Sequence, residues 1–191
     1  LHNNVFTVDA YNEEVWIGYG DVNSGYKPYP LKKRGISKLF DGYWKNIPFQ
    51  EVYDANDLVK VRINKKNPFQ VYFTSYQKGL LQVKDDTPTK LYNQTNSVLT
   101  IAKGSTSFGI RLYGLDFDKD GNLWTVQTGV RHGLIRFTPE GESAKVDLDG
   151  VIPYDRELSL TDLVVTKEGY VFFGTAHNGV VGYNPQTKKF N

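Results

Sequence analysis

Short runs of alternating apolar and polar residues, separated by turns, make up most of this chain. In the clearest segment, residues 115–118 alternate between apolar and acidic, residues 118–122 contain an Asp-Gly turn, and residues 123–126 read Leu-Trp-Thr-Val. Two alternating runs joined by an Asp-Gly pair are typical of a β-hairpin. Residues 133–139 supply a third run after a loop with two glycines. The pattern therefore predicts three consecutive antiparallel strands.

The same pattern occurs four times, at intervals of about 50 residues. Each copy has an aromatic residue in its second run and a glycine at the start of its third run. The four aromatic residues are Trp16, Tyr72, Trp124 and Phe172. The four glycines are Gly35, Gly79, Gly133 and Gly179. Each copy closes with a short run that has a lysine ahead of an apolar residue, at 45–47, 90–91, 145–146 and 189–190.

Four antiparallel strands repeated with this period predict the blades of a β-propeller. One blade cannot bury both faces of its sheet, so blades stack side by side, and the second-strand aromatic is expected to fill the wedge between neighbours. We expect an all-β fold with four four-stranded antiparallel blades, forming part of a larger ring. The segment 1–191 divides into blades at about 1–50, 51–95, 96–150 and 151–191. Open sheet edges at both ends would need to be covered by ring closure or by a partner.

Composition narrows the class of protein. The chain has 23 basic and 21 acidic residues and a net charge of +2, which favours neither nucleic acid nor a membrane surface as a partner. No apolar run is long enough to span a bilayer, and the N-terminal residues do not have the pattern of a signal peptide. The absence of cysteine excludes a disulfide framework, a thiolate nucleophile and a Cys-ligated metal. Methionine is also absent, so we expect a fragment or a processed form of a longer protein.

The third copy resembles a known repeat. Residues 118–124, Asp-Lys-Asp-Gly-Asn-Leu-Trp, followed by Gly-Leu-Ile-Arg-Phe at 133–137, are similar to the two-component-regulator propeller repeat. Residues 168–175 with Gly179 match that repeat in part, and the first two copies have different turns. Repeats of this family occur in the periplasmic sensor regions of hybrid histidine kinases of Bacteroidetes.

The first two copies carry a second resemblance, in the long loop at 20–37 and in residues 40–45 and 79–97. These segments are similar to the propeller region of PorZ-like proteins, cell-surface components associated with the type IX secretion system of Bacteroidetes. The resemblance implies an extracytoplasmic location, in the periplasm or at the cell surface. It also implies a non-enzymatic role, because it supplies no catalytic residues and no cofactor.

The long first loop holds the most compact basic run of the chain. Lys32, Lys33 and Arg34 follow Tyr26 and Tyr29 in a proline-containing segment. Long loops on a rigid scaffold often carry function, so these residues are a candidate lip for an anion or a glycan. The alternative is a solvated loop that its prolines stiffen.

Three more candidates lie before third strands. Arg131 and His132 precede the third strand of the third copy, and His177 takes the matching place in the fourth. The two histidines are expected to face one rim as ligand contacts. Neither has an acidic residue at ligand spacing in the sequence, so no metal site is predicted and a plain surface-loop role is the alternative.

Several acidic residues are candidates for metal binding or catalysis. Asp116, Asp118, Asp120 and Gly121 spell the opening of a calcium loop, but its twelfth position is Gln127, so a hairpin turn explains them better. Asp57 and Asp162 come at the start of a first strand, where propeller enzymes sometimes place acids and where an aspartate more often binds adjoining backbone. No Gly-x-Ser-x-Gly nucleophile motif is present.

Together these features favour a non-enzymatic binding or assembly module of a surface or periplasmic bacterial protein, similar to the PorZ-like group. The expected partner is a glycan, a lipopolysaccharide-type ligand or another surface protein, and not nucleic acid. A ligand-sensing ectodomain of a hybrid two-component system, which would bind an oligosaccharide, is the first alternative. A propeller lyase or glycosidase acting on polysaccharide is the second.

Overall fold

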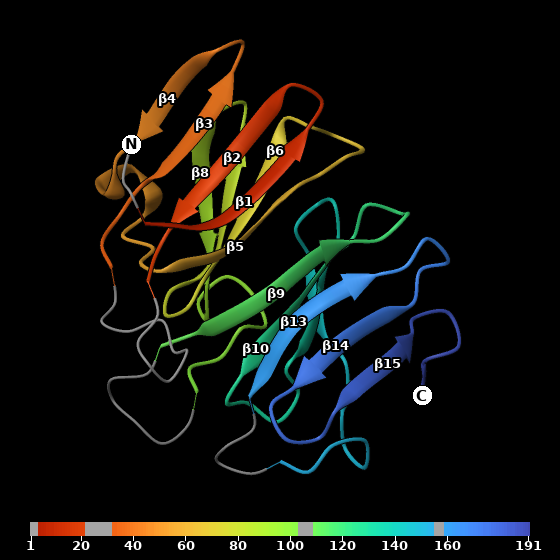
Figure 1. Ribbon diagram of the computed structural model, residues 1–191. Coiled ribbons are helices and arrows are strands. Elements are labelled where there is room, and N and C mark those ends of the chain that lie inside the picture. Colours follow the sequence, from red (N-terminus) through yellow and green to blue (C-terminus); the bar gives the residue numbers. More distant parts are fainter. Residues whose placement is uncertain (1–3, 22–31, 103–108, 155–158) are drawn as a thin grey trace. The chain divides into compact units, whose positions relative to one another are not determined.

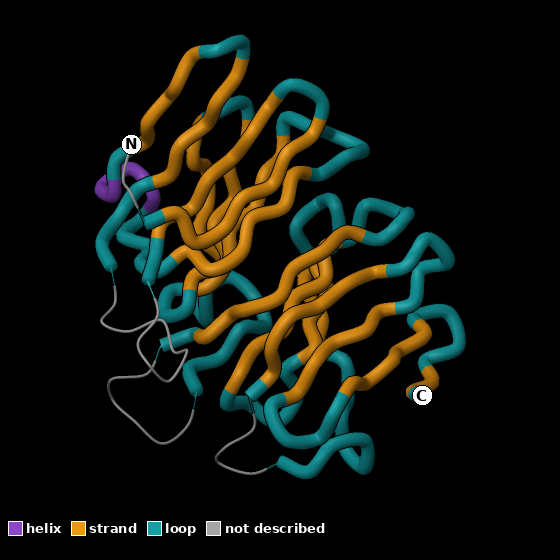
Figure 2. The backbone as a smooth tube through the Cα atoms, in the orientation of Figure 1, coloured by secondary structure: helices purple, strands orange, loops and turns teal. Residues whose placement is uncertain are grey.

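The computed structural model describes residues 4–21, 32–102, 109–154 and 159–191. The chain divides into two compact units, Leu1–Tyr92 and Asn93–Asn191. Each unit contains two four-stranded antiparallel sheets in which consecutive strands are neighbours (Figure 1). The predicted all-β architecture of four four-stranded sheets is confirmed, and strands dominate the tube drawn in Figure 2. No helix in the described parts of the chain is long and apolar enough to cross a bilayer.

The first unit is built from β1 to β8 and one short 3₁₀ helix, η1. Its first sheet comprises β1 (Val5–Tyr11), β2 (Glu14–Tyr19), β3 (Ile36–Phe40) and β4 (Tyr43–Ile47). Its second sheet comprises β5 (Leu58–Ile63), β6 (Gln70–Ser75), β7 (Gly79–Lys84) and β8 (Thr87–Tyr92). The helix η1 (Phe49–Val52) connects the two sheets.

The second unit repeats this plan with β9 to β16. Its first sheet comprises β9 (Arg111–Phe117), β10 (Leu123–Thr128), β11 (Leu134–Phe137) and β12 (Ser143–Lys145). Its second sheet comprises β13 (Leu160–Val165), β14 (Val171–Thr175), β15 (Val180–Asn184) and β16 (Lys189–Phe190).

In each unit the core lies between the two sheets, with a tryptophan from the first sheet in it. Trp16 on β2 is buried and meets Phe73 of β6 edge to face, with 6.1 Å between ring centroids. Trp124 on β10 is buried and meets Tyr183 of β15 in the same manner, at 5.9 Å. Edge-to-face pairs add to the free energy gained by burying the rings themselves. The predicted wedge role is therefore confirmed for Trp16 and Trp124.

The aromatic residues of the other two second strands take a different place. Side chains alternate between the faces of a strand, and in β6 and β14 the core position belongs to the next residue, Phe73 or Phe173. Tyr72 and Phe172 therefore lie on the opposite face of their sheets. Tyr72 is buried there, and Phe172 is half-buried. They therefore do not lie in the wedge between the two sheets of their own unit.

One aspartate in each unit ties its two sheets together by accepting a hydrogen bond from a backbone N–H. Asp9 lies opposite Trp16 in the β1–β2 register, and its Oδ2 accepts a hydrogen bond of 2.8 Å from the backbone N–H of Ile63 in β5. Asp116 lies opposite Trp124, and its Oδ2 accepts a bond of 2.9 Å from the N–H of Val165 in β13. Hydrogen bonds to an ionised acceptor are about twice as strong as neutral ones. An aspartate at the equivalent position thus fixes the alignment of the two sheets in each unit.

The Asp-x-x-Gly-Asn turn of the third copy is organised around Asp118. Its carboxylate accepts hydrogen bonds from the backbone N–H of Asp120 and Asn122, from the Asn122 side chain and from Nε1 of Trp124. These donors use both oxygens, so the group acts as the organiser of a hairpin turn and not as the start of a calcium loop. The first copy lacks this aspartate, and within the described part of the chain the buried Nε1 of Trp16 has no hydrogen-bond partner.

The glycines at the start of the third strands have two physical reasons. A Cβ atom at Gly133 would lie 2.3 Å from the carbonyl oxygen of Gln127, and one at Gly35 would meet Ile47 even more closely. Gly79 and Gly179 instead have φ angles of 113° and 72°, which side chains rarely tolerate. Gly35 and Gly133 therefore leave no room for a side chain, and Gly79 and Gly179 have backbone angles that favour glycine.

Asp57 holds the end of the long β2–β3 connection against the second sheet of its unit. Its Oδ1 accepts a hydrogen bond of 2.8 Å from the Lys32 N–H, and its own N–H bonds the Lys32 carbonyl. The residue is 1% exposed, and its Oδ2 has no hydrogen-bond partner among the residues that the structure describes. Burial raises the pKa of this carboxyl to about 6, although the Lys32 hydrogen bond and charge oppose the shift and Asp21 adds to it. The predicted binding of adjoining backbone is confirmed.

The bridge at Asp116 yields a first prediction. Asp116→Ala removes the acceptor for Val165 and for the N–H of Phe117, which Oδ1 holds at 3.0 Å. We expect the free energy of unfolding to fall by about 1–3 kcal/mol, because two partly buried N–H groups lose a charged partner. Urea denaturation followed by tryptophan fluorescence measures it. Asp120→Ala, at an exposed turn position, is the control and should change stability by less than about 0.5 kcal/mol. Equal effects of the two variants would contradict the bridging role.

The buried Asp57 yields a second prediction, on pH. Because its folded-state pKa lies above its unfolded value, the folded protein binds more protons, and this group makes the free energy of unfolding fall as pH rises from about 4 to 6. Asp57→Asn keeps an acceptor for Lys32 and removes the charge. We expect the difference in free energy of unfolding, variant minus wild type, to rise by about 2 kcal/mol between pH 4 and pH 7. Denaturation at both pH values measures this difference, with the exposed Asp54→Asn as control. The same pH dependence of the free energy of unfolding in wild type and Asp57→Asn would refute the prediction.

Candidate functional site

Two neighbouring cavities open on the loops at one end of the second unit's sheets. The larger has a volume of about 610 Å³ and is lined by Arg131 and by residues 149–154. The smaller has a volume of about 300 Å³. Its lining residues are Thr100, Ile101, Gly129, Val130, Arg131, His132, Lys145 and Tyr154. Because Arg131 and Tyr154 line both, we treat the two cavities as one site and call it the rim cleft.

Buried anchors hold the loops that form the rim cleft. In the β12–β13 loop, Leu148 is 1% exposed and Ile152 is 7% exposed, and both belong to the core between the two sheets. The backbone N–H of Leu148 donates a hydrogen bond of 3.3 Å to Nδ1 of His132, on the β10–β11 loop. The two loops are thereby joined, and the polar residues between the anchors are presented to solvent.

The strongest polar contact of the rim cleft is a bidentate ion pair. Nε and Nη2 of Arg131 donate to the two carboxylate oxygens of Asp149 at 2.6 and 2.7 Å. These hydrogen bonds hold the pKa of Asp149 below its usual value, and the same bonds raise the pKa of Arg131. Both side chains are about half exposed, so the pair is accessible to a ligand.

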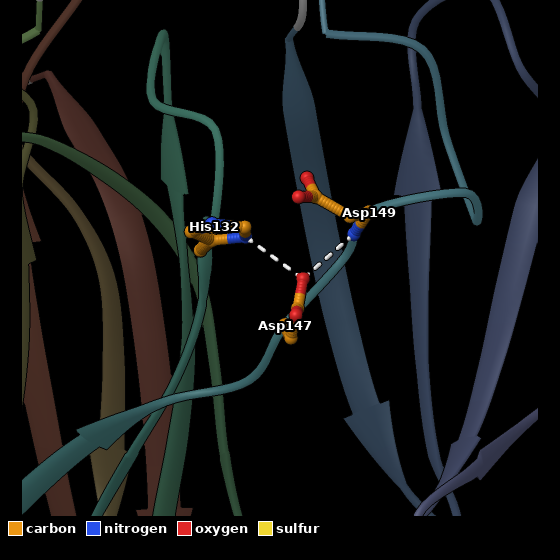
Figure 3. A group of neighbouring side chains, drawn as sticks. All are labelled: His132, Asp147 and Asp149. Carbon is orange, nitrogen blue, oxygen red and sulfur yellow. Dashed lines mark hydrogen bonds and ion pairs between the residues drawn. The ribbon is translucent and has the colours of Figure 1, made fainter.

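His132, Asp147 and Asp149 form a cluster at the same place, with His132 on one loop and the two aspartates on the facing loop (Figure 3). Nδ1 of His132 lies 3.4 Å from Oδ1 of Asp147, which also accepts the backbone N–H of Asp149. One potential ligand atom from each of the three lies within 4.8 Å of the others. However, both oxygens of Asp149 are engaged by Arg131. A metal ion would have to displace that permanent cation, so the arrangement fits a polar binding surface better than a metal centre.

Apolar groups complete the rim cleft. Tyr154 is 46% exposed and Ile101 is 51% exposed, and both line it. An exposed aromatic ring supplies a flat amphipathic surface, and neighbouring charged groups of fixed geometry supply donors and acceptors that set a ligand's orientation. Arg131, His132 and Asp149 supply these donors and acceptors in the cleft, and Asp147 lies beside His132. The site can therefore hold a ligand that has a flat apolar face and several hydroxyl groups.

The predicted ligand contacts fall into separate places. Arg131 and His132 both lie in the rim cleft, whereas His177 is exposed between β14 and β15 and is not among its lining residues. Lys33 and Arg34 line a different cavity, of about 430 Å³, in the first unit. The candidates Tyr26 and Tyr29 lie outside the described residues. Lys32 is held by Asp57 through its backbone, and its Nζ is 4.0 Å from Asp21.

Two cleft residues, Asp149 and Tyr154, and Asp147 beside the cleft were not predicted from the sequence. Asp147, Asp149 and Tyr154 come after the third copy's last strand and carry no motif of their own. The sequence has no acidic residue at ligand spacing from His132, but the fold brings Asp147 and Asp149 to it across two loops. A signal was available in the Asp-Leu-Asp-Gly sequence at 147–150, whose two aspartates with an apolar residue between them suggest an anchored turn.

Comparison with known proteins rests on structure. No protein-family model and no curated protein sequence matches this chain. PorZ, a surface component of the type IX secretion system of Porphyromonas gingivalis, aligns with a TM-score of 0.77 at 14% identity, over 95% of this chain and 25% of that one. The extracellular domain of a putative one-component system from B. thetaiotaomicron aligns with a TM-score of 0.66 at 16% identity, over 98% and 22%.

Enzymes also share this architecture. Virginiamycin B lyase from Staphylococcus aureus aligns with a TM-score of 0.67 at 13% identity, over 100% of this chain and 56% of that one. This chain therefore spans about a quarter of the length of the first two structures and about half of the third. At these identities the likeness shows the fold alone, and with the four four-stranded sheets it shows that the chain consists of β-propeller blades.

Proposed function

We propose that this chain is a non-enzymatic binding module of an extracytoplasmic bacterial protein of the PorZ-like kind, and that its rim cleft binds a glycan. The observation that carries the proposal is the exposed Arg131–Asp149 pair beside the exposed ring of Tyr154. A sugar ring can lie against the aromatic face while adjacent hydroxyl groups bond the carboxylate and guanidinium. The long loops that bear these residues are the part of a rigid scaffold on which binding sites commonly form.

The electrostatics of the rim cleft support binding over catalysis. The pKa of Asp149 is lowered, so this carboxyl is ionised at neutral pH and cannot act there as a general acid. The pKa of Arg131 is raised, so the guanidinium stays charged. Burial lowers the pKa of Lys145, whose Nζ lies 3.4 Å from the hydroxyl of Thr100. Asp149, the carboxyl among the described lining residues, thus lacks the raised pKa that a proton donor to a glycosidic oxygen requires.

A sensing role is the second candidate. It is favoured by the likeness to an extracellular domain of a putative one-component system, which covers 98% of this chain. The rim cleft would serve the same ligand chemistry in either setting, with an oligosaccharide as the signal. The two candidates differ in the consequence of binding, which is assembly at the cell surface in one and a signal passed across the membrane in the other.

Binding by the rim cleft is tested on a glycan array with the whole chain and single variants. Tyr154→Ala and Arg131→Ala should each weaken binding about tenfold, because a central aromatic or arginine contact contributes roughly 1–2 kcal/mol. Tyr43→Ala is the matched control, since Tyr43 is 78% exposed on β4 in the first unit. Its affinity should equal that of the wild type.

Three outcomes would contradict the proposal. Unchanged binding by Tyr154→Ala and Arg131→Ala would remove the rim cleft as the site. Loss of binding in the Lys33→Ala, Arg34→Ala double variant alone would move the site to the first unit's cavity. Turnover of a polysaccharide by the pure protein would show that the module is an enzyme.

A further inference from the structure

A further cavity lies between the two sheets of the second unit, on the side of β11, β12, β15 and β16. Its volume is about 340 Å³, and we call it the inter-sheet pocket. Its lining residues are Trp124, Arg136, Ala144, Lys145, Val146, Asp147, Tyr183, Pro185, Lys188 and Phe190. Of these, Arg136 and Lys188 do not line the rim cleft.

The floor of the inter-sheet pocket is aromatic. Tyr183 contacts Trp124 edge to face on one side, and its ring centroid lies 4.8 Å from that of Phe190 on the other. Trp124 and Tyr183 are 2% and 6% exposed, so these rings are held by the core. A rigid aromatic floor of this kind can bind a flat apolar group without reorganisation.

The wall of the pocket is cationic. Arg136 on β11 and Lys188 in the β15–β16 turn both line it, and within the described residues neither side chain has a hydrogen bond or an ion pair. The acid that also lines it, Asp147, is engaged by the N–H of Asp149 and lies beside His132. With Lys145, the lining holds three cationic side chains and one carboxylate, so it carries a net positive charge above an apolar floor.

In the first unit, the position equivalent to the inter-sheet pocket is filled by an ion-paired lysine. Lys38 lies opposite Trp16 in the β2–β3 register, as Arg136 lies opposite Trp124 in the β10–β11 register. Nζ of Lys38 is 2.8 Å from Glu14 and 2.7 Å from Asp86, and its side chain is only 8% exposed. Two carboxylates thus neutralise the cation and fill the wedge.

Both of those acids are replaced in the second unit. Glu14 lies two residues before Trp16, and the residue two before Trp124 is Asn122, which is bound to Asp118. Asp86 is the last residue of the β7–β8 turn, with a φ of 60°, and the last residue of the β15–β16 turn is Lys188, with a φ of 57°. A lysine therefore stands in the backbone position from which the first unit supplies its carboxylate.

We propose that the inter-sheet pocket binds an anionic group carried on an aromatic ring, with the anion between Arg136 and Lys188 in the place that the Asp86 carboxylate takes in the first unit. The ring lies on Tyr183 and Phe190. Arginine suits a planar or tetrahedral oxyanion because its guanidinium donates two parallel hydrogen bonds. This pocket shares Lys145 with the rim cleft, but Arg136, Lys188, Tyr183 and Phe190 do not line that cleft. The glycan test and the test below can therefore succeed or fail independently.

Phenyl phosphate is the probe, titrated into the whole chain by calorimetry. We expect saturable binding by the wild type, and binding at least about tenfold weaker in Arg136→Gln, because a hydrogen bond to a charged group contributes roughly 1.5–3 kcal/mol. Inorganic phosphate and phenol should each bind at least about tenfold more weakly than phenyl phosphate. An equal affinity for inorganic phosphate would refute the aromatic floor, and an equal affinity for phenol would refute the cationic wall.

Lys188→Asp gives the sharpest test, because it rebuilds the acid of the first unit opposite Arg136. We expect it to abolish binding of phenyl phosphate and to raise the midpoint of thermal unfolding, so that loss of binding is not loss of fold. Lys167→Asp is the matched control, since Lys167 is exposed in the β13–β14 turn of the same unit and does not line the pocket. Wild-type binding by Lys188→Asp, or no binding by the folded wild type at millimolar probe, would overturn the proposal.

Discussion

The structure depends on the contact between a tryptophan-bearing sheet and the next sheet along the chain in each unit. A four-stranded sheet of this length has two faces and cannot bury either by itself. Trp16 and Trp124 fill the wedge, while Asp9 and Asp116, opposite them in register, bond an N–H of the facing strand. Burial supplies the free energy and is non-directional, whereas the charged hydrogen bond sets one register. The loops that form the two proposed sites are positioned by this contact.

The two units solve the same packing problem with different charges. In the first unit the wedge is closed by Lys38 between Glu14 and Asp86, and Nζ of Lys38 lies 5.6 Å from the ring centroid of Trp16. In the second unit the equivalent cation is Arg136, and both acids are gone. Two substitutions in a repeat can thus convert a structural ion pair into a cavity with unpaired cations. The scaffold tolerates this because the tryptophan contact below remains complete.

The rim cleft illustrates a different use of the repeat. Its charged residues come from the loops between strands, whose lengths differ between copies, while buried Leu148 and Ile152 keep one of these loops against the core. A half-exposed arginine would sample many conformations if it were free. The bidentate contact with Asp149 orients it and leaves both groups accessible. Binding residues on anchored loops therefore share the rigidity of the blades.

The sequence by itself determined the blades: a period of about 50 residues, alternation within each strand, and glycines where a Cβ would meet backbone or where φ is positive. These are local rules, so one chain segment is enough to read them. It also placed Arg131 and His132 among the candidates. Only the tertiary structure decided that Asp147 and Asp149 meet them, that Phe73 and Phe173 take the core positions of β6 and β14, and that Arg136 and Lys188 line one pocket. Those contacts join loops and turns of different strands, and their chemistry depends on distances that no local pattern encodes.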